Sequence, residues 1–230
     1  MIKHYIFDLD GTLLDTVPDL TRAIQDTLIA FGLPSVTLEE TKTFIGGGAP
    51  QFVQAALKGK GDDPVFFEKF FAAYMIRYEA YQLEYARIYP GILSLLQSIQ
   101  QQGHHAYVFS NKPHALTVTL INQIFPGLFK GVHGHIPHTL PKPDRTMFDR
   151  FAARHQIDLA ESVFIGDAPP DILMGQTLGI PTIALTYGYS TVEVLKSYHP
   201  TFILDTADAI LPTIKKIERM PDHGRVNPKR

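Results

Sequence analysis

Cysteine is absent from the 230 residues of this chain. Disulfides, thiolate catalysis and zinc sites built on cysteine are therefore excluded, and the absence fits a reducing compartment. An excess of charge of one sign is also missing, because 21 Lys and Arg residues face 23 Asp and Glu residues, for a formal net charge of -2. Such a chain has no basic field to attract nucleic acid and no Lys/Arg run to bind a membrane surface.

Long hydrophobic runs are missing as well. No stretch reaches the roughly 18 apolar residues of a transmembrane helix, and charges interrupt the apolar N-terminal stretch too early for a signal peptide. Yet 45% of the residues are hydrophobic and 19% are charged, which provides enough apolar surface for a buried core. We therefore expect a soluble, cytoplasmic protein.

The hydrophobic pattern divides the chain into a helical block and an alternating region. Residues 16–85 carry apolar residues at helical spacing without a strand signal, which predicts helices over 18–31, from Thr37, over 51–57 and over about 64–87. After Tyr89-Pro90-Gly91, helices and strands alternate. The predicted strands are 5–7, 106–109, 131–133, 162–165, 182–185 and 201–204, and the predicted later helices are 92–102, 115–125, 146–155, 171–178 and 207–217.

Strands that alternate with helices predict a parallel sheet covered on both faces. We therefore predict the α/β class, with a Rossmann-like three-layer core domain formed by residues 1–15 and 86–220. The all-helical block 16–85, inserted after the first strand, should lie over the carboxyl edge of the sheet as a cap domain. Residues 221–230 are polar, contain Pro and Gly, and are expected to form a flexible tail.

Acidic residues follow two of the predicted strands. Asp8 and Asp10 leave the first strand, and Asp167 and Asp171 follow the strand 162–165. The carboxyl ends of parallel strands meet at one edge, so these carboxylates should lie together, which is costly unless a cation is bound. Oxygen donors without a His/Cys cluster suit a hard ion such as Mg²⁺.

The same edge could carry out phosphoryl transfer. A carboxylate can attack phosphorus, and a second one nearby can protonate the leaving oxygen and later activate water; Asp8 and Asp10 have the spacing for these roles. Ser110 offers a hydroxyl after a strand, and Lys142 offers a cation between two prolines. Taken singly, these segments are typical of a turn, a helix cap and a solvated loop. Their order, each after a strand or in a connecting loop, favours a site.

At these residues the sequence resembles the haloacid dehalogenase superfamily. The resemblance covers roughly residues 2–217, and its motifs stand in the family's order. They are Phe7-Asp8-Leu9-Asp10-Gly11-Thr12-Leu13-Leu14-Asp15-Thr16, Phe109-Ser110-Asn111-Lys112, Lys142-Pro143-Asp144 and Ile165-Gly166-Asp167-Ala168-Pro169-Pro170-Asp171.

The resemblance implies a role for each matched residue. Asp8 is the nucleophile, and Asp10 is the general acid and base. Ser110 and Lys142 hold the phosphoryl group, and Asn111 supports Ser110 by orienting the loop.

The resemblance also implies a Mg²⁺ site. Asp8 and Asp167 bind the metal through their carboxylates, and Asp10 binds it through its backbone carbonyl. Asp171 supports the metal directly or through water. An acid/base Asp at position 10 is similar to the pattern of the phosphatases and phosphomutases, whereas the dehalogenases lack that role and the transport ATPases carry Thr there.

The helical block is similar to the small C1-type cap of the phosphoglycolate phosphatase-like branch. Gly46, Gly47 and Gly48 match a cap loop that helps choose the substrate, although a plain interhelical turn explains them equally well from chain chemistry. The implied substrate is a small phosphorylated metabolite, with phosphoglycolate as the first candidate. A β-phosphoglucomutase-type phosphomutase, a pyrophosphatase, a nucleotidase and a non-catalytic binding module stay as alternatives. Both a monomer and a homodimer fit.

Some residues depart from the pattern or stand outside it. Ala168 replaces a family hydroxyl and Pro170 stiffens the approach to Asp171, so both bear on the role of Asp171. His133, His135 and His138 cluster in a Pro/Gly-rich connection without a defined ligand spacing, so we expect a loop beside the site rather than a metal centre. The aromatic residues between positions 66 and 85 have helical spacing and are interpreted as cap packing, with self-association as an alternative.

Overall fold

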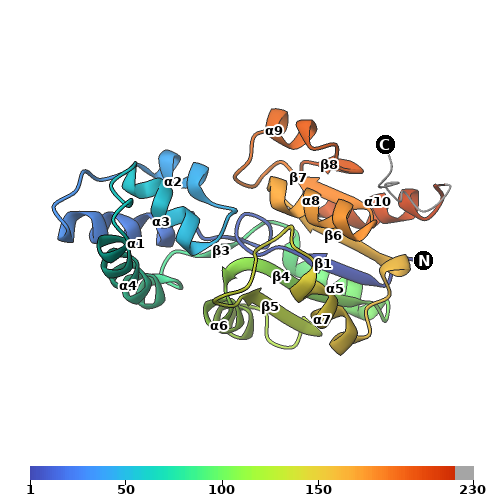
Figure 1. Ribbon diagram of the computed structural model, residues 1–230. Helices are drawn as coiled ribbons and strands as arrows, with labels where there is room; N and C mark the ends of the chain where they lie inside the picture. The colour runs from blue at the N-terminus through green and yellow to red at the C-terminus, as the bar shows by residue number, and fades with distance from the viewer. Residues whose placement is uncertain (221–230) are drawn as a thin grey trace.

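A six-stranded parallel sheet forms the centre of the larger part of the molecule (Figure 1). The computed structural model describes residues 1–220, so the tail expected at 221–230 lies outside the described residues. The strand order is β5-β4-β1-β6-β7-β8. These strands are β1 (His4–Phe7), β4 (His105–Pro113), β5 (Gly131–His135), β6 (Ser162–Gly166), β7 (Thr182–Leu185) and β8 (Phe202–Leu204).

Helices cover both faces of this sheet, as the alternating pattern predicts. They are α5 (Ile92–Gln101), α6 (His114–Ile124), α7 (Thr146–His155), α8 (Pro169–Leu178), α9 (Val192–Ser197) and α10 (Ile210–Ile217). Alternate residues of β1 enter different clusters: Tyr5 and Phe7 pack with α5, α6 and α10, and Ile6 packs with α7 and α8. This two-sided burial explains the unbroken apolar run of β1.

The helical insert forms a separate block, seen at the left of Figure 1. It consists of α1 (Val17–Ala30), α2 (Leu38–Phe44), α3 (Ala49–Leu57) and α4 (Pro64–Tyr81). Pro18 lies in the first turn of α1, and Thr37 with Glu40 forms the capping box of α2, as their sequence positions predict. The insert has its own core, in which Ile24, Phe52 and Phe70 are buried.

A short antiparallel pair joins the insert to the sheet. β2 (Leu14–Asp15) pairs with β3 (Arg87–Ile88), and the prediction of a helix reaching residue 87 is wrong because α4 ends at Tyr81. The buried carboxylate of Asp19 accepts hydrogen bonds from Tyr85 N at 2.8 Å and Ala86 N at 3.0 Å. These bonds hold the backbone in a non-helical path toward β3.

Two further expectations need correction. β4 continues through Ser110 and Asn111 to Pro113 instead of ending at Phe109, and its pairing with β5 is irregular over this stretch. The α9 helix was not predicted, because its six residues are too few for a periodic signal. Among residues 1–220, none of the helices combines the length and the apolar character needed to cross a membrane.

Candidate active site

The first acidic motif lies at the carboxyl end of β1. Asp8 directly follows Phe7 and keeps the strand pairing by donating its N–H to Ile165 O at 3.0 Å. Gly11 then turns the chain with a φ of 85°, and a Cβ at this position would collide with the Asp167 carboxylate. Glycine therefore lets the β1 loop approach the acidic residue that follows β6.

Asp8, Asp167 and Asp171 form a buried acidic cluster. Each offers an oxygen within 4.8 Å of the others, and their exposed fractions are 7%, 1% and 2%. Burial and the charges of Asp171 and Asp8 raise the pKa of Asp167 well above its usual range. The tertiary structure thus brings together three residues that the sequence placed after two different strands.

Thr12 and Tyr189 fix the orientation of Asp167. Thr12 Oγ1 donates to Asp167 Oδ1 at 2.6 Å, and Tyr189 N donates to Asp167 Oδ2 at 2.9 Å. Neither role was predicted. The role of Thr12 could have been suspected because Thr12 belongs to the first motif. Tyr189 lies in a loop after β7 that carries no motif, so nothing in the sequence indicated its role.

Lys142 lies against this cluster with its side chain only 1% exposed. Its Nζ is 2.9 Å from Asp8 Oδ1 and 2.6 Å from Asp171 Oδ1. Burial by itself lowers the pKa of Lys142, but the ion pairs with Asp171 and Asp8 outweigh burial and raise this pKa above its usual value. Lys142 is therefore a fixed cation beside Asp8, not the solvated loop residue that its flanking prolines also suggest.

Asp171 holds the turn between β6 and α8. Its Oδ2 accepts hydrogen bonds from Asp167 N at 3.1 Å and Ala168 N at 3.0 Å. Ala168, which lacks the family hydroxyl, thus contributes its backbone N–H instead. Pro170 lies in the first turn of α8, where a helix has no partner for an N–H group, so it does not disturb Asp171. Burial raises the pKa of Asp171 to about 6, although Lys142 opposes this rise.

The donor set fits a divalent cation. Carboxylate oxygens are the ligands that hard ions prefer, and a bound cation would relieve the repulsion that raises the pKa of Asp167. When all are ionised, the side chains at this edge carry four negative and two positive charges, which leaves a formal charge of -2. They are Asp8, Asp10, Asp167, Asp171, Lys112 and Lys142.

Asn111 links the helical insert to the loop that carries Lys142. Its Nδ2 donates to Gly46 O at 2.8 Å, and its Oδ1 accepts from Lys142 N at 2.7 Å. We expected Asn111 to support Ser110 by orienting its loop. Its side chain instead contacts the insert and the backbone of Lys142, and not the Ser110 hydroxyl. Ser110 is 4% exposed and lies at the pocket beside Asp8.

Lys112 is a site residue that sequence reasoning missed. Its Nζ lies 3.1 Å from Asp10 Oδ1 and 3.3 Å from Asp10 Oδ2, and it also donates to the Tyr78 hydroxyl of α4. Asp10 Oδ1 further accepts a hydrogen bond from Thr16 Oγ1 at 2.7 Å. The signal for Lys112 was its place directly after Ser110-Asn111, but nothing local showed that it reaches Asp10.

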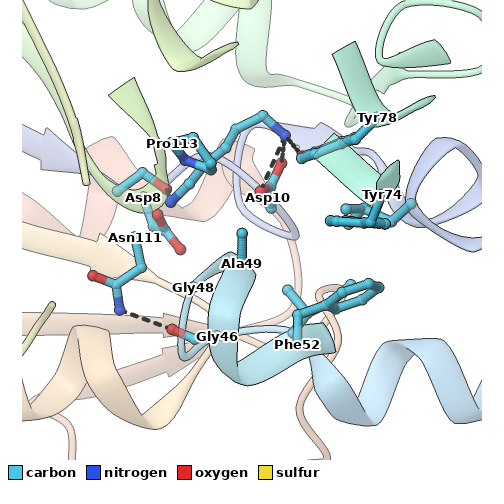
Figure 2. A pocket seen from close by; sticks show the side chains of 14 residues that line it. Asp8, Asp10, Gly46, Gly48, Ala49, Phe52, Tyr74, Tyr78, Asn111 and Pro113 are labelled. Atoms are coloured by element: carbon cyan, nitrogen blue, oxygen red, sulfur yellow. Dashed lines mark hydrogen bonds and ion pairs between the residues drawn. The ribbon is translucent and has the colours of Figure 1, made fainter. Parts of the chain in front are cut away.

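A pocket lies between the insert and the sheet edge, with a volume of about 420 Å³ that includes space open to solvent. Figure 2 shows Tyr74, Tyr78 and Phe52 along one side of it, opposite Asp8 and Asn111. Gly46 and Gly48 line it as well, and Tyr74 and Tyr78 come from the aromatic run of α4. The packing interpretation of that run is therefore incomplete, because these buried rings also face the pocket.

The glycine loop has a defined geometry at the pocket. Gly48 precedes α3 with a φ of 91°, and a Cβ there would lie 3.1 Å from Asn111 O. Gly46 also has a positive φ, of 121°, while Gly47 does not. The loop thus packs directly on the end of β4, which a plain interhelical turn would not require.

The histidine-rich connection forms no ligand group. His133 stacks on Phe109 with ring centroids 5.0 Å apart, and His135 Nε2 is bonded to Thr139 O at 2.9 Å. The metal-ligand geometry found within residues 1–220 is that of the acidic cluster. His133 and His135 lie in strand β5, which runs to His135, so the expectation of a loop is wrong for these two residues.

Known proteins resemble this chain over most of its length. The sequence profile of the haloacid dehalogenase-like hydrolase family matches residues 5–185. The chain belongs to this family. As a haloacid dehalogenase-like hydrolase it is 33% identical to phosphoglycolate phosphatase 1 of Pseudomonas aeruginosa over 213 residues, which cover 90% of this chain and 78% of that one. It is 29% identical to the phosphoglycolate phosphatase of Vibrio parahaemolyticus, with 93% and 96% covered.

Solved structures of similar fold include proteins named as phosphoglycolate phosphatases. A proposed phosphoglycolate phosphatase from Lactobacillus delbrueckii superposes with a TM-score of 0.85 at 27% identity, covering 92% of this chain and 98% of that one. A predicted phosphoglycolate phosphatase from Haemophilus somnus gives a TM-score of 0.83 at 26% identity, covering 92% and 97%. The fold, including the helical insert, is thus shared with phosphoglycolate phosphatase-like proteins.

Proposed function

We propose that this protein is a Mg²⁺-dependent phosphatase that hydrolyses a small phosphate monoester through an aspartyl-phosphate on Asp8. One observation carries this proposal: Asp8 lies between a buried cation, Lys142, and a pocket that also contains Asp10. A carboxylate in this position can attack phosphorus, and a second carboxylate in the same pocket can exchange protons with the leaving oxygen.

The acidic cluster would hold the metal. Asp8 and Asp167 supply carboxylate oxygens, Asp10 its backbone carbonyl, and Asp171 supports them directly or through water. When bound, Mg²⁺ neutralises charge on the phosphoryl oxygens and on Asp8. Asp171 contributes in a second way, because its hydrogen bonds fix both the turn that carries Asp167 and the ammonium group of Lys142.

The side chains then divide the chemistry between them. A carboxylate oxygen of Asp8 forms a bond to phosphorus while the bond from phosphorus to the ester oxygen breaks, and Asp10 donates its proton to that oxygen. Asp10 next takes a proton from water, whose oxygen attacks phosphorus and releases Asp8 and inorganic phosphate. Lys142 and the Ser110 hydroxyl bind the phosphoryl oxygens through both steps.

The helical region 16–85 would act as a cap that shapes the substrate site. Its residues form one wall of the pocket, and the Asn111–Gly46 hydrogen bond holds the glycine loop on the core. The enclosed part of this pocket must also hold the phosphoryl group, so it leaves room for a short leaving group only. Phosphoglycolate is the first candidate, supported by the names of the relatives.

A phosphate-release screen with and without Mg²⁺ tests the function. Small phosphoesters, nucleotides and pyrophosphate are offered to the full chain, and we expect Mg²⁺-dependent release from small monoesters. Asp8→Asn should lower kcat by about 1,000-fold or more, because it removes the nucleophile. The exposed Asp62→Asn is the matched control and should keep full activity. Full activity of Asp8→Asn would contradict this mechanism.

The same screen separates the remaining alternatives. Conversion of a sugar 1-phosphate to a 6-phosphate would select a phosphomutase, which shares Asp8 and Asp10. Preferred release from pyrophosphate or from nucleotides would redirect the substrate assignment within the same mechanism. Absence of release across the whole panel would favour a binding module instead.

A further inference from the structure

Lys112 is the cation that faces the substrate pocket. The described residues lining the pocket include Lys112 from β4 but not Lys142, which lies with the acidic cluster. The side chain of Lys112 is 1% exposed, so its charge acts in a medium that screens it weakly. Lys112 contacts Asp10, the residue that would protonate the leaving oxygen. The group attached to that oxygen must therefore pass close to Lys112.

Two tyrosines of α4 line the same pocket as this cation. Tyr74 and Tyr78 are both essentially buried, and their rings stack with centroids 5.5 Å apart (Figure 2). Tyr78 OH accepts a hydrogen bond from Lys112, so its own hydrogen stays available for donation. Tyr74 OH is buried without a hydrogen-bond partner among the described residues. An unpartnered buried hydroxyl costs stability, so its presence at a pocket points to a ligand that completes it.

These donors together favour a carboxylate as the ligand. The Lys112 ammonium has three N–H groups and contacts three acceptors, Asp10 Oδ1, Asp10 Oδ2 and the Tyr78 hydroxyl, so a substrate would share the N–H of the longest contact, the one to Asp10 Oδ2 at 3.3 Å. Together with the Tyr74 and Tyr78 hydroxyls, this gives a cation and two neutral donors next to the leaving oxygen. A carboxylate has two oxygens that accept several hydrogen bonds and a charge that matches the ammonium.

We infer that Lys112, Tyr74 and Tyr78 form a subsite that selects a short phosphate monoester whose leaving alcohol carries a carboxylate. This inference rests on the proposed phosphatase function and assigns the residues that recognise the part of the substrate beyond phosphorus. Leu20, Ile45, Ala49 and Phe52 also line the pocket. These apolar side chains offer nothing to a hydroxyl-rich leaving group such as a sugar, which would lose its hydrogen bonds to water there.

A pair of esters of nearly equal size tests the subsite. Phosphoglycolate carries a carboxylate, and 2-hydroxyethyl phosphate carries a neutral hydroxyl at the same place. We expect wild type to prefer phosphoglycolate in kcat/KM. Lys112→Met should lower kcat/KM for phosphoglycolate by about 10- to 100-fold more than for the neutral ester, the range of a hydrogen bond to a charged group. Lys112→Arg, which keeps the charge, should retain part of the preference.

Tyr74→Phe removes one hydroxyl and keeps the ring. We expect it to lower kcat/KM for phosphoglycolate by about 10-fold and for the neutral ester by less, because a hydrogen bond to an uncharged hydroxyl is weaker. Tyr81→Phe is its control on the same helix, because the Tyr81 hydroxyl bonds Asp26 outside the pocket. Calorimetry with Asp8→Asn and with Asp8→Asn/Lys112→Met measures substrate binding without turnover and should show the same loss for the acidic ester.

The outcomes separate the subsite from the proposed function. If Lys112→Met lowers both esters equally, Lys112 merely positions Asp10, and the inference is overturned while the phosphatase assignment stands. Equal use of the two esters by wild type also overturns it. If wild type hydrolyses neither these esters nor any other monoester, the proposed function itself fails.

Discussion

At the scale of single residues, the site is defined by how charges are paired. Lys142 is paired with Asp8 and Asp171, and Lys112 with Asp10, while within residues 1–220 Asp167 is held by the neutral donors Thr12 and Tyr189 alone. Asp167 is therefore the carboxylate whose charge depends most on a cation. Burial first, and then the charges of Asp171 and Asp8, raise its pKa well above the usual range.

We expect Asp167→Asn to change the free energy of unfolding in opposite directions with and without metal. The amide can accept from Tyr189 N and donate to the Thr12 hydroxyl, so the hydrogen bonds of Asp167 can be kept. Without metal, the loss of a repelled buried charge should raise the free energy of unfolding by about 1 kcal/mol. Mg²⁺ at about 100 times its Kd should add about 2.7 kcal/mol to wild type and nothing to the variant. Urea denaturation with EDTA or Mg²⁺ measures both, and an unchanged Mg²⁺ effect would count against the metal site.

At the scale of elements, one sheet edge and one helical block share the pocket. β1, β4 and β6 place Asp8, Ser110 and Asp167 at the same edge because their carboxyl ends point the same way. α3 and α4 supply the opposite wall. The glycine loop between α2 and α3 is where the two meet, and Asn111 holds it.

Asn111→Ala should release this loop. The variant loses the bonds to Gly46 O and Lys142 N, each worth about 1 kcal/mol, so the glycine loop and Lys142 both lose their fixed positions. We expect kcat/KM to fall by about 10- to 100-fold, with KM rising, and amide exchange to quicken over residues 45–48. Steady-state kinetics and hydrogen exchange measure these effects. Asn122→Ala, an exposed Asn→Ala change on α6, is the control. Normal exchange in the loop would show that Asn111 does not hold it.

At the scale of the whole molecule, two separate cores carry the stability. One lies around the sheet and the other inside the helical insert, and the pair β2–β3 joins them. The edge strand β5 carries the half-buried imidazole ring of His133. Burial first, and then the nearby His114 and His135, lower the pKa of His133 to about 4.

This lowered pKa predicts a dependence of stability on pH. The unfolded chain takes up a proton on His133 near pH 6.5, and the folded protein does so only near pH 4. Between these values the unfolded state binds more protons, so the free energy of unfolding should fall as the pH falls. Urea denaturation at pH 7, 6 and 5 should show this slope, and His133→Gln should reduce it. His4, His105 and His155 also have lowered pKa values and add to this slope, whereas the raised pKa values of Asp167 and Asp171 oppose it, so the part due to His133 is the difference between wild type and His133→Gln. An identical slope in the variant would contradict the assignment to His133.

Much of the fold was predictable because its signals are local. The unbroken apolar run of β1, the capping box at Thr37 and the alternation after residue 89 depend on neighbours in the sequence. The end of α4 was not predictable, because the bonds from Asp19 to Tyr85 and Ala86 join residues far apart in the chain. The extension of β4 through Ser110 depends in the same way on long-range pairing.

The sequence by itself determined which carboxylates follow strands, and so that Asp8, Asp10, Asp167 and Asp171 meet at one edge, because parallel strands all end on the same side. Only the tertiary structure decided which groups approach that edge from elsewhere. Tyr74 and Tyr78 reach Lys112 from a helix in the insert, and the periodicity of α4 cannot tell which of its aromatic rings faces the pocket. The docking of one core against the other makes that choice, because contacts between distant segments have no signature in local spacing.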